Sequence, residues 1–135
     1  MIDADKIRDI SIVCGLYKSF PRYQEHTYED VLQHILPSIT LGQYKVHYEN
    51  DLPIAFTNWA FLSEKAEQKF MKTADLNPQD FNSGNIVWAI DLICCGNIKN
   101  VMKLNKEYFT VKWLRVSEDQ TIKRMTIKYT KGHYA

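Results

Sequence analysis

The feature that most constrains the fold is an apolar segment, residues 86–95, that carries one carboxylate in its middle. The segment reads IVWAIDLICC, and Asp91 is its only charged residue. An apolar run of this length between turn residues predicts a strand that is buried on both faces, at the centre of a sheet. A buried carboxylate persists where a cation or hydrogen-bond donors meet it. Asp91 is therefore expected to face such partners, or else to lie at a sheet edge or cap a helix.

The surrounding pattern predicts an α+β fold. Apolar spacings of three and four predict a helix over 3–18 and a second one after a capping box at Thr27 and Asp30, with a kink at Pro37. Asn50-Asp51 is a hairpin turn signal. The expected elements are helices over 3–18, from 28 to about 39, 64–73 and 97–106, and strands over 43–49, 53–60, 86–93, 109–116 and 124–129. They form a mostly antiparallel sheet flanked by helices, in one domain over residues 1–135.

Composition excludes several classes of protein. The net charge of +1 gives no argument for binding nucleic acid or an anionic membrane, and no stretch has the length of a membrane span. The start of the chain lacks the pattern of a signal peptide. Three cysteines, Cys14, Cys94 and Cys95, have neither disulfide nor metal-site spacing, so we expect free thiols, no metal and a cytoplasmic location.

Two blocks of residues carry a resemblance to a known family. The first is ILPSITLGQYKVHYENDLPIAFTNWAFLS, residues 35–63, and the second contains Ser83-Gly84, Trp88 and Ile90-Asp91. The matching elements of the first block are Leu36-Pro37, Gln43-Tyr44, Pro53, Trp59-Ala60 and Leu62-Ser63. Together the blocks resemble the toxin-activating lysine acyltransferases, the hemolysin-activating family of bacterial RTX operons. The chain resembles a short, divergent member over roughly residues 19–116.

The resemblance implies a fold, an activity and a set of partners. The fold would be that of GNAT-like acyltransferases, which share the expected order of elements and are often homodimers. The activity would be transfer of a fatty acyl group from acyl carrier protein, with no bound cofactor, to an internal lysine of a protoxin. The substrate-binding residues carried over from the motifs are Trp59, Ser83, Gly84 and Trp88.

The family's catalytic pair is a histidine and the aspartate of the W.ID strand, and Asp91 matches the aspartate. The histidine position falls on Tyr23, and the nearest histidine is His26. A lysine ammonium must lose a proton before it attacks, and a tyrosine with a pKa near 10 is a poor base. Either the loop is shifted and His26 is the base, or the histidine is lost. His34 is expected to be solvated, on the side of its helix opposite Val31 and Ile35.

The departures from the family pattern leave other functions open. A chain without the histidine could be a catalytically altered member that acts as a protein-binding accessory or inhibitor. Cys94 and Cys95 stand where the family has an Ala-Pro-Phe-Gly segment, and either thiol could accept an acyl group. A small-amine acetyltransferase is disfavoured because no Gly-rich pyrophosphate loop is present. Basic residues near the C-terminus could steer an acidic carrier protein or be ordinary surface charges: Lys112, Arg115, Lys123, Arg124, Lys128 and Lys131.

Overall fold

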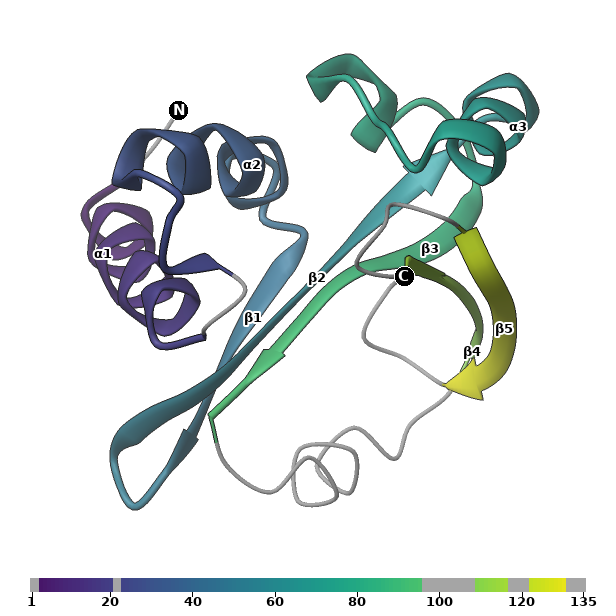
Figure 1. The fold of residues 1–135 in the computed structure, drawn as a ribbon. Helices are drawn as coiled ribbons and strands as arrows, with labels where there is room; N and C mark the ends of the chain where they lie inside the picture. Colours follow the sequence, from purple (N-terminus) through teal and green to yellow (C-terminus); the bar gives the residue numbers. More distant parts are fainter. Residues whose placement is uncertain (1–2, 21–22, 96–108, 117–121, 131–135) are drawn as a thin grey trace. The chain divides into compact units, whose positions relative to one another are not determined.

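The computed structural model describes residues 3–20, 23–95, 109–116 and 122–130, with side chains described as far as Cys95. Its helices and strands confirm an α+β fold (Figure 1). The helices are α1 (Ala4–Lys18), α2 (Tyr28–Thr40), α3 (Glu64–Thr73) and the short 3-10 helix η2 (Pro78–Phe81). The strands are β1 (Tyr44–Glu49), β2 (Leu52–Leu62), β3 (Ile86–Cys94), β4 (Phe109–Val116) and β5 (Ile122–Thr130). The helix expected over 97–106 lies outside the described residues.

The described strands follow the order β1-β2-β3-β4-β5 in the sheet. β1 pairs with β2 and β4 pairs with β5 in antiparallel fashion, whereas β3 pairs with β4 in parallel at Trp88 and Lys112. β2 and β3 run in opposite directions in Figure 1. The central place of β3 agrees with the expectation from its apolar sequence, but burial on both faces does not: Trp88 and Ile93 are buried, most other residues of β3 are partly exposed, and Leu92 is 42% exposed.

The turn between β1 and β2 is set by two residues with positive φ. Asn50 has φ 52° and Asp51 has φ 64°, the left-handed values that a two-residue hairpin turn requires. Asn and Asp tolerate this region better than other non-glycine residues. The turn fixes the register of the hairpin, in which Asn58 of β2 lies opposite Tyr44 of β1.

The chain divides into two compact units. The first unit contains the residues up to Asn58 together with β3 from Asp91 onward, and the second contains Trp59–Ile90 together with β4 and β5. Each unit has its own cluster of buried apolar side chains. The expectation of one domain over 1–135 stays a prediction.

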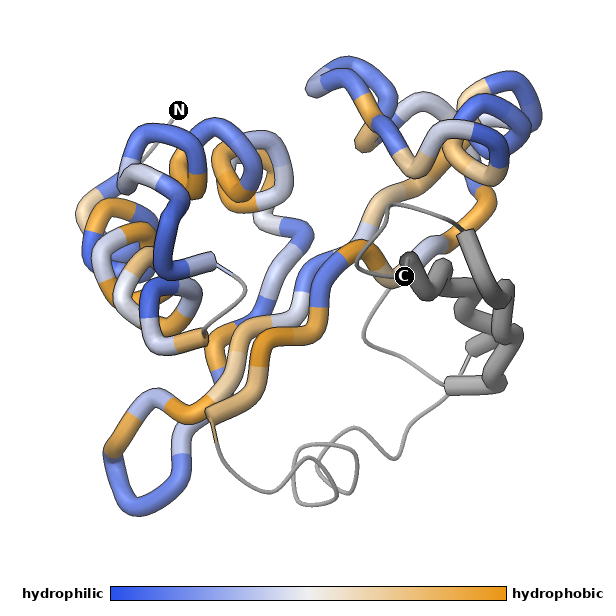
Figure 2. Tube along the Cα trace, in the orientation of Figure 1, coloured by the Kyte–Doolittle hydropathy of each residue, from blue (hydrophilic) through white to orange (hydrophobic). Residues whose placement is uncertain are grey.

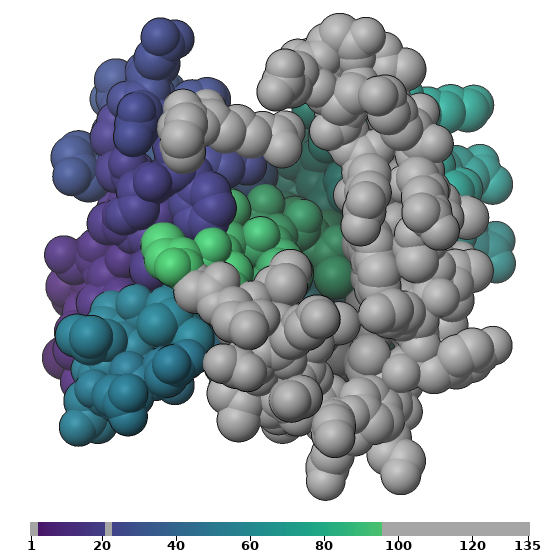
Figure 3. Space-filling model, turned by 60° about the horizontal axis from the view of Figure 1, so that its bottom comes forward, coloured from purple at the N-terminus to yellow at the C-terminus, as the bar shows by residue number. Residues whose placement is uncertain are grey.

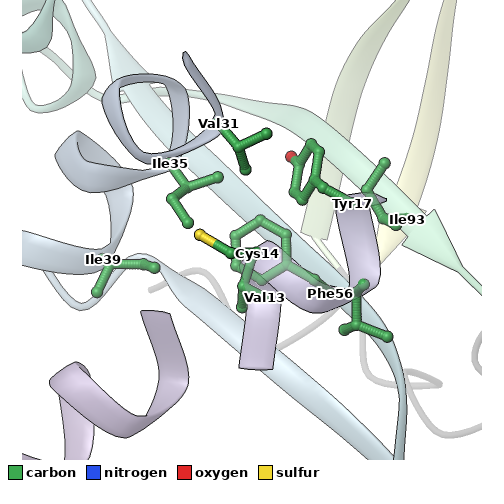
Figure 4. Packing of buried hydrophobic residues seen from close by; sticks show 9 residues of the cluster. Val13, Cys14, Tyr17, Val31, Ile35, Ile39, Phe56 and Ile93 are labelled. Atoms are coloured by element: carbon green, nitrogen blue, oxygen red, sulfur yellow. The ribbon is translucent and has the colours of Figure 1, made fainter. Parts of the chain in front are cut away.

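The first unit packs α1 and α2 on one face of the hairpin (Figure 1). Figure 2 shows hydrophobic residues along β2 and β3 and on parts of both helices. The core cluster is drawn in Figure 4 and contains Val13, Cys14, Leu16, Tyr17, Val31, Ile35, Ile39, Phe56 and Ile93. Burial of such side chains contributes about 1.5–3 kcal/mol each, so this cluster holds α2 against the strands.

Helix α2 begins at the capping box expected from the sequence. The Thr27 hydroxyl accepts a hydrogen bond from Asp30 N–H at 3.1 Å, and the Asp30 carboxylate accepts one from Thr27 N–H at 3.1 Å. This backbone donor lowers the pKa of Asp30. The helix continues through Pro37 to Thr40, which places one side of its third turn against β2 and β3. Among the described helices, none has the length and apolar content needed to cross a membrane.

Candidate functional site

A histidine and a buried carboxylate meet in the first unit. Nε2 of His34, from the middle of α2, lies 2.9 Å from Oδ2 of Asp91, from β3. The Asp91 side chain is 11% exposed and that of His34 is 49% exposed. In the space-filling view of Figure 3, green atoms of β3 lie beside purple atoms of the N-terminal helices. Asp91 thus has the kind of partner that its place in an apolar strand demands.

The electrostatics of the pair favour a charged imidazole. The hydrogen bond to Asp91 and the charge of that carboxylate raise the pKa of His34, and partial burial of the ring opposes them. The half-exposed ring remains accessible to a reacting group from solvent. A histidine is the side chain whose ordinary pKa allows it both to accept and to return a proton under physiological conditions, and the raised pKa makes His34 a stronger base.

Two further polar side chains surround Asp91, and both are almost completely buried. Oδ1 of Asn58 accepts a hydrogen bond from Asp91 N–H at 2.7 Å, and Nδ2 of Asn58 lies 3.2 Å from Asp91 Oδ2. The same Nδ2 donates to Ser38 Oγ at 3.0 Å, and Ser38 Oγ–H donates to Ile35 C=O at 3.0 Å. Asn58 is 1% exposed and Ser38 is fully buried. A buried polar network of this kind holds its members in one geometry when all are satisfied.

Tyr17 of α1 completes the surroundings of the pair. It is 1% exposed, and its ring meets that of His34 edge to face at 6.1 Å. Burial and then the Asp91 charge raise the pKa of the Tyr17 phenol, so the hydroxyl keeps its proton. Among the described residues, this hydroxyl has no hydrogen bond of ordinary distance and angle. Tyr17 therefore acts on the site through packing and through a neutral dipole near the carboxylate.

The structure corrects the expectation for His34. Its side chain was expected in solvent, opposite Val31 and Ile35; it is 49% exposed, so this part of the expectation holds, but its ring is also bonded to Asp91. His34 is three residues after Val31 and four before Ser38, and both of these are buried. Residues three and four apart share one side of a helix. The imidazole therefore lies at the border of the buried face, and this spacing was the signal that could have found it.

The two residues expected to supply the base lie in the loop before α2. Tyr23 stacks edge to face on Tyr17 at 5.0 Å, and His26 stacks on Tyr23 at 5.6 Å. Lys18 donates hydrogen bonds to the carbonyls of Gln24 and His26, which fastens this loop to the end of α1. The imidazole that the structure places in hydrogen-bond contact with Asp91 is that of His34. Catalytic roles for His26 and Tyr23 stay predictions.

The four residues expected to bind substrate all lie in the second unit. Trp59 is 9% exposed and Trp88 is fully buried, with its Nε1–H donating to Glu67 Oε2 at 2.7 Å. Ser83 Oγ accepts from Ser63 N–H at 3.0 Å and donates to Asp80 C=O at 2.8 Å. These contacts show that Trp88 and Ser83 stabilise the fold. The role of the four residues in binding substrate stays a prediction.

Gly84, the fourth of these residues, stands where no side chain fits. A Cβ there would lie 2.5 Å from Leu62 O and 2.6 Å from Ser63 N, which are backbone atoms of the end of β2. We expect Gly84→Ala to lower the free energy of unfolding by about 1–3 kcal/mol, because the backbone must shift to relieve the overlap. Urea unfolding followed by circular dichroism measures the change.

Gly15 provides the matched control for this substitution. It lies in α1, and nothing lies within 4 Å of the position of its Cβ. Gly15→Ala should leave stability unchanged or raise it by up to about 1 kcal/mol, because alanine favours the helix. Equal stability of the two alanine variants would contradict the close packing of Gly84 on β2.

Other expectations concern cysteines, metals and the basic C-terminal residues. Cys94 is partly buried and Cys95 is exposed, and their role as acyl acceptors stays a prediction. In the ranges that the structure describes, no group of three His, Cys, Asp or Glu side chains is placed to hold a metal ion. The side chains of the six basic residues from Lys112 to Lys131 lie outside the described residues.

The arrangement can perform proton transfer. Catalysis by a general base needs a group that carries an available lone pair near neutral pH, and a half-exposed imidazole meets that need. The carboxylate behind it orients the ring and stabilises the imidazolium that forms. His34 and Asp91 therefore form a candidate base and its orienting partner.

Comparisons with known proteins find similarity to lysine acyltransferases. The leukotoxin-activating lysine-acyltransferase LktC of a Pasteurella haemolytica-like species is 34% identical over 82 residues, which cover 60% of this chain and 50% of the relative. The lysine-acyltransferase RtxC of Vibrio cholerae is 33% identical over 76 residues, covering 54% and 49%. The protein-lysine myristoyltransferase RtxC of Kingella kingae is 27% identical over 90 residues, covering 66% and 54%.

The chain spans about half the length of these curated relatives. The sequence profile of the RTX toxin acyltransferase family matches residues 4–129, which is nearly the whole chain. The match includes α1, α2 and β3, from which Tyr17, His34 and Asp91 come. The chain therefore belongs to the RTX toxin acyltransferase family.

Proposed function

We propose that the chain is a protein-lysine acyltransferase in which His34 is the general base and Asp91 is its partner. The contact of 2.9 Å between His34 Nε2 and Asp91 Oδ2 is the observation that carries this proposal. It supplies an imidazole for the family's aspartate although Tyr23 stands at the family's histidine position. The pair supports an active enzyme over the alternative of a catalytically altered member that only binds a protein partner.

The proposed reaction transfers an acyl group from a thioester to a lysine ε-amine. The imidazole of His34 takes a proton from the lysine ammonium, and the freed lone pair attacks the thioester carbonyl carbon. A C–N bond forms and the C–S bond breaks; the second proton on the nitrogen passes to the departing thiolate, so the donor leaves as a thiol, and the imidazolium of His34 returns its proton to solvent. Asp91 stabilises the imidazolium while it holds the proton, as an orienting carboxylate does beside other catalytic histidines.

The relatives support the choice of substrate and the sequence supports the donor. LktC is named for activating a leukotoxin, and the Kingella kingae relative is named for transferring myristoyl groups to protein lysines. We propose a protein of the RTX toxin kind as acceptor and an acyl-loaded acyl carrier protein as donor. The donor assignment rests on the resemblance to the toxin-activating acyltransferases. The proposed reaction needs no bound cofactor.

The finer assignments of fold, assembly and location belong to the same proposal. The order of a hairpin, a helix, a central strand and two further strands supports a GNAT-like acyltransferase fold. A homodimer is proposed from the resemblance to the family. A cytoplasmic location is proposed because Cys14, Cys94 and Cys95 are free thiols.

A transfer assay tests the proposed function. The chain is incubated with myristoyl-acyl carrier protein and the unacylated leukotoxin that LktC activates, and lysines of the leukotoxin are searched by mass spectrometry for a myristoyl increment. We expect acylated lysine with the chain present and none without it. Failure of both carrier-protein binding and acyl transfer would favour the alternative of an accessory or inhibitory binder.

A further inference from the structure

We propose that Asn58, held by Ser38, is a positioning residue that fixes which nitrogen of His34 acts as the base. The inference rests on the proposed function for its catalytic meaning, but its physical content is the order of protons among four side chains. These are Ser38 and His34 on α2, Asn58 on β2 and Asp91 on β3. The order leaves Nδ1 of His34 with the lone pair.

The orientation of the Asn58 amide is dictated by the backbone. A peptide N–H can only donate, so the atom of Asn58 that lies 2.7 Å from Asp91 N must be the oxygen, Oδ1. The amide nitrogen Nδ2 then faces Ser38 Oγ and Asp91 Oδ2, and can donate a proton to each. If the Asn58 amide were flipped, its Nδ2 would face the backbone N–H of Asp91, and both of these groups are donors.

Ser38 locks this orientation. Its own hydroxyl proton is directed at the Ile35 carbonyl, 3.0 Å away, which leaves the oxygen as an acceptor for Asn58. With Ser38 fully buried and Asn58 1% exposed, replacement of these bonds by bonds to solvent is hindered in the folded protein. Asn58 therefore presents a donor to Asp91 Oδ2 at all times.

The ionised Asp91 carboxylate can only accept hydrogen bonds, and Asn58 holds its Oδ2 against the ring of His34, so together they set the tautomer of His34. An oxygen that already accepts from Asn58 at 3.2 Å is a poor place for a proton, because that proton would point at an N–H group. Asp91 Oδ2 thus accepts from His34 as well, and Nε2 of the neutral ring must carry hydrogen. The lone pair of the neutral ring is then on Nδ1, away from Asp91, where a lysine ammonium could give up its proton.

Nitrogen-15 spectra of the histidine rings in the full chain test the proton order without any substrate. The His34 signals are identified by their loss in His34→Gln. Above the pKa of His34 we expect a single tautomer protonated at Nε2 in the wild type. In Asn58→Ala the Asp91 carboxylate is no longer held against the ring and can rotate away from Nε2, so we expect a mixture of both tautomers, and in Ser38→Ala a smaller change of the same kind. Asn85→Ala, which replaces an exposed asparagine, is the matched control and should match the wild type.

Kinetics add a readout that a purely structural role would not move. We expect Asn58→Ala to lower kcat for acyl transfer by about 10–100-fold, which corresponds to the loss of one or two hydrogen bonds to a charged group. KM for the carrier protein should change less than about twofold, since Asn58 is buried. A wild-type ring protonated at Nδ1 would overturn the proposal, as would an Asn58→Ala variant with unchanged tautomer and unchanged kcat.

Failure of the proposed acyltransferase function can be distinguished from failure of the positioning role of Asn58. If the wild type transfers no acyl group, the proposed function fails, and the ring spectra still decide whether Asn58 sets the tautomer. If transfer occurs but the spectra of the variants equal the wild type, the positioning role fails and the proposed function stands. Should Asn58→Ala fail to fold, Ser38→Ala carries the test, because it removes the acceptor of Asn58 Nδ2 and the donor to the Ile35 carbonyl but leaves both contacts of Asn58 to Asp91 possible.

Discussion

His34→Ala is expected to lower the rate of lysine acylation by about 10²–10⁴-fold, the usual contribution of a positioned general base. The ring is half exposed and contributes little to the core, so the variant should fold. The measurement is the initial rate of acyl transfer from myristoyl-acyl carrier protein, at saturating carrier protein and constant pH. A structural check by circular dichroism separates loss of the base from loss of the fold.

Two neighbouring substitutions sharpen the result. Gln33, the exposed residue beside His34 on α2, provides the matched control, and Gln33→Ala should keep the rate within about twofold of the wild type. His26→Ala should cost less than His34→Ala, because His26 contacts Tyr23 rather than Asp91 among the described residues. The reverse order of losses would return the base to His26, the residue favoured by the sequence alone.

Much of the first unit could be predicted because local signals decide it. The Thr27 and Asp30 side chains cap α2 through their own backbone, and Asn50-Asp51 forms the hairpin turn with its own left-handed φ values. The apolar sequence of residues 86–93, interrupted only by Asp91, predicted the central strand without knowledge of its neighbours. Each of these features depends on residues that are adjacent in sequence.

Asp91 was expected at the site, but its pairing with His34 and the bond between Asn58 and Ser38 were not predicted, because these contacts join residues that are distant in sequence. Asp91 and His34 are 57 positions apart, and Asn58 and Ser38 are 20 apart. No local pattern says which side of α2 faces β3. The available signal was polarity inside an apolar stripe: Ser38 falls on the buried spacing of Val31 and Ile35, and its hydroxyl needed a partner there. A search for such partners would have favoured His34 over His26.

Asp91→Asn is the second prediction with a large effect, because it removes the charge and keeps the shape. Asparagine can still accept from His34, but it cannot stabilise an imidazolium as a carboxylate does. We expect acyl transfer to fall by about 10²–10⁴-fold, in line with the loss seen when the carboxylate behind a catalytic histidine is made an amide. The rate of transfer is measured against pH for both proteins.

The pH dependence gives the sign of the effect. In the wild type, Asp91 raises the pKa of His34 above its ordinary value of about 6.5, so the rate should rise with pH through a midpoint above that value. In Asp91→Asn the midpoint should move to lower pH, because the charge that holds the proton on His34 is gone. A midpoint of the pH–rate profile that is equal or lower in the wild type than in Asp91→Asn would contradict the claim that Asp91 raises the pKa of His34.

The contact between His34 and Asp91 should also make the free energy of unfolding depend on pH. A folded-state pKa above the unfolded one means that His34 contributes stability in full below about pH 6.5. That contribution is lost as pH rises through the raised pKa of the folded state. Between about pH 6.5 and the raised pKa of His34, the free energy of unfolding of the wild type should therefore fall relative to that of Asp91→Asn. The variant lacks the stability that the charged contact between His34 and Asp91 contributes. Urea unfolding at a series of pH values measures the difference, and parallel curves for the two proteins would show that the contact between His34 and Asp91 does not persist in solution.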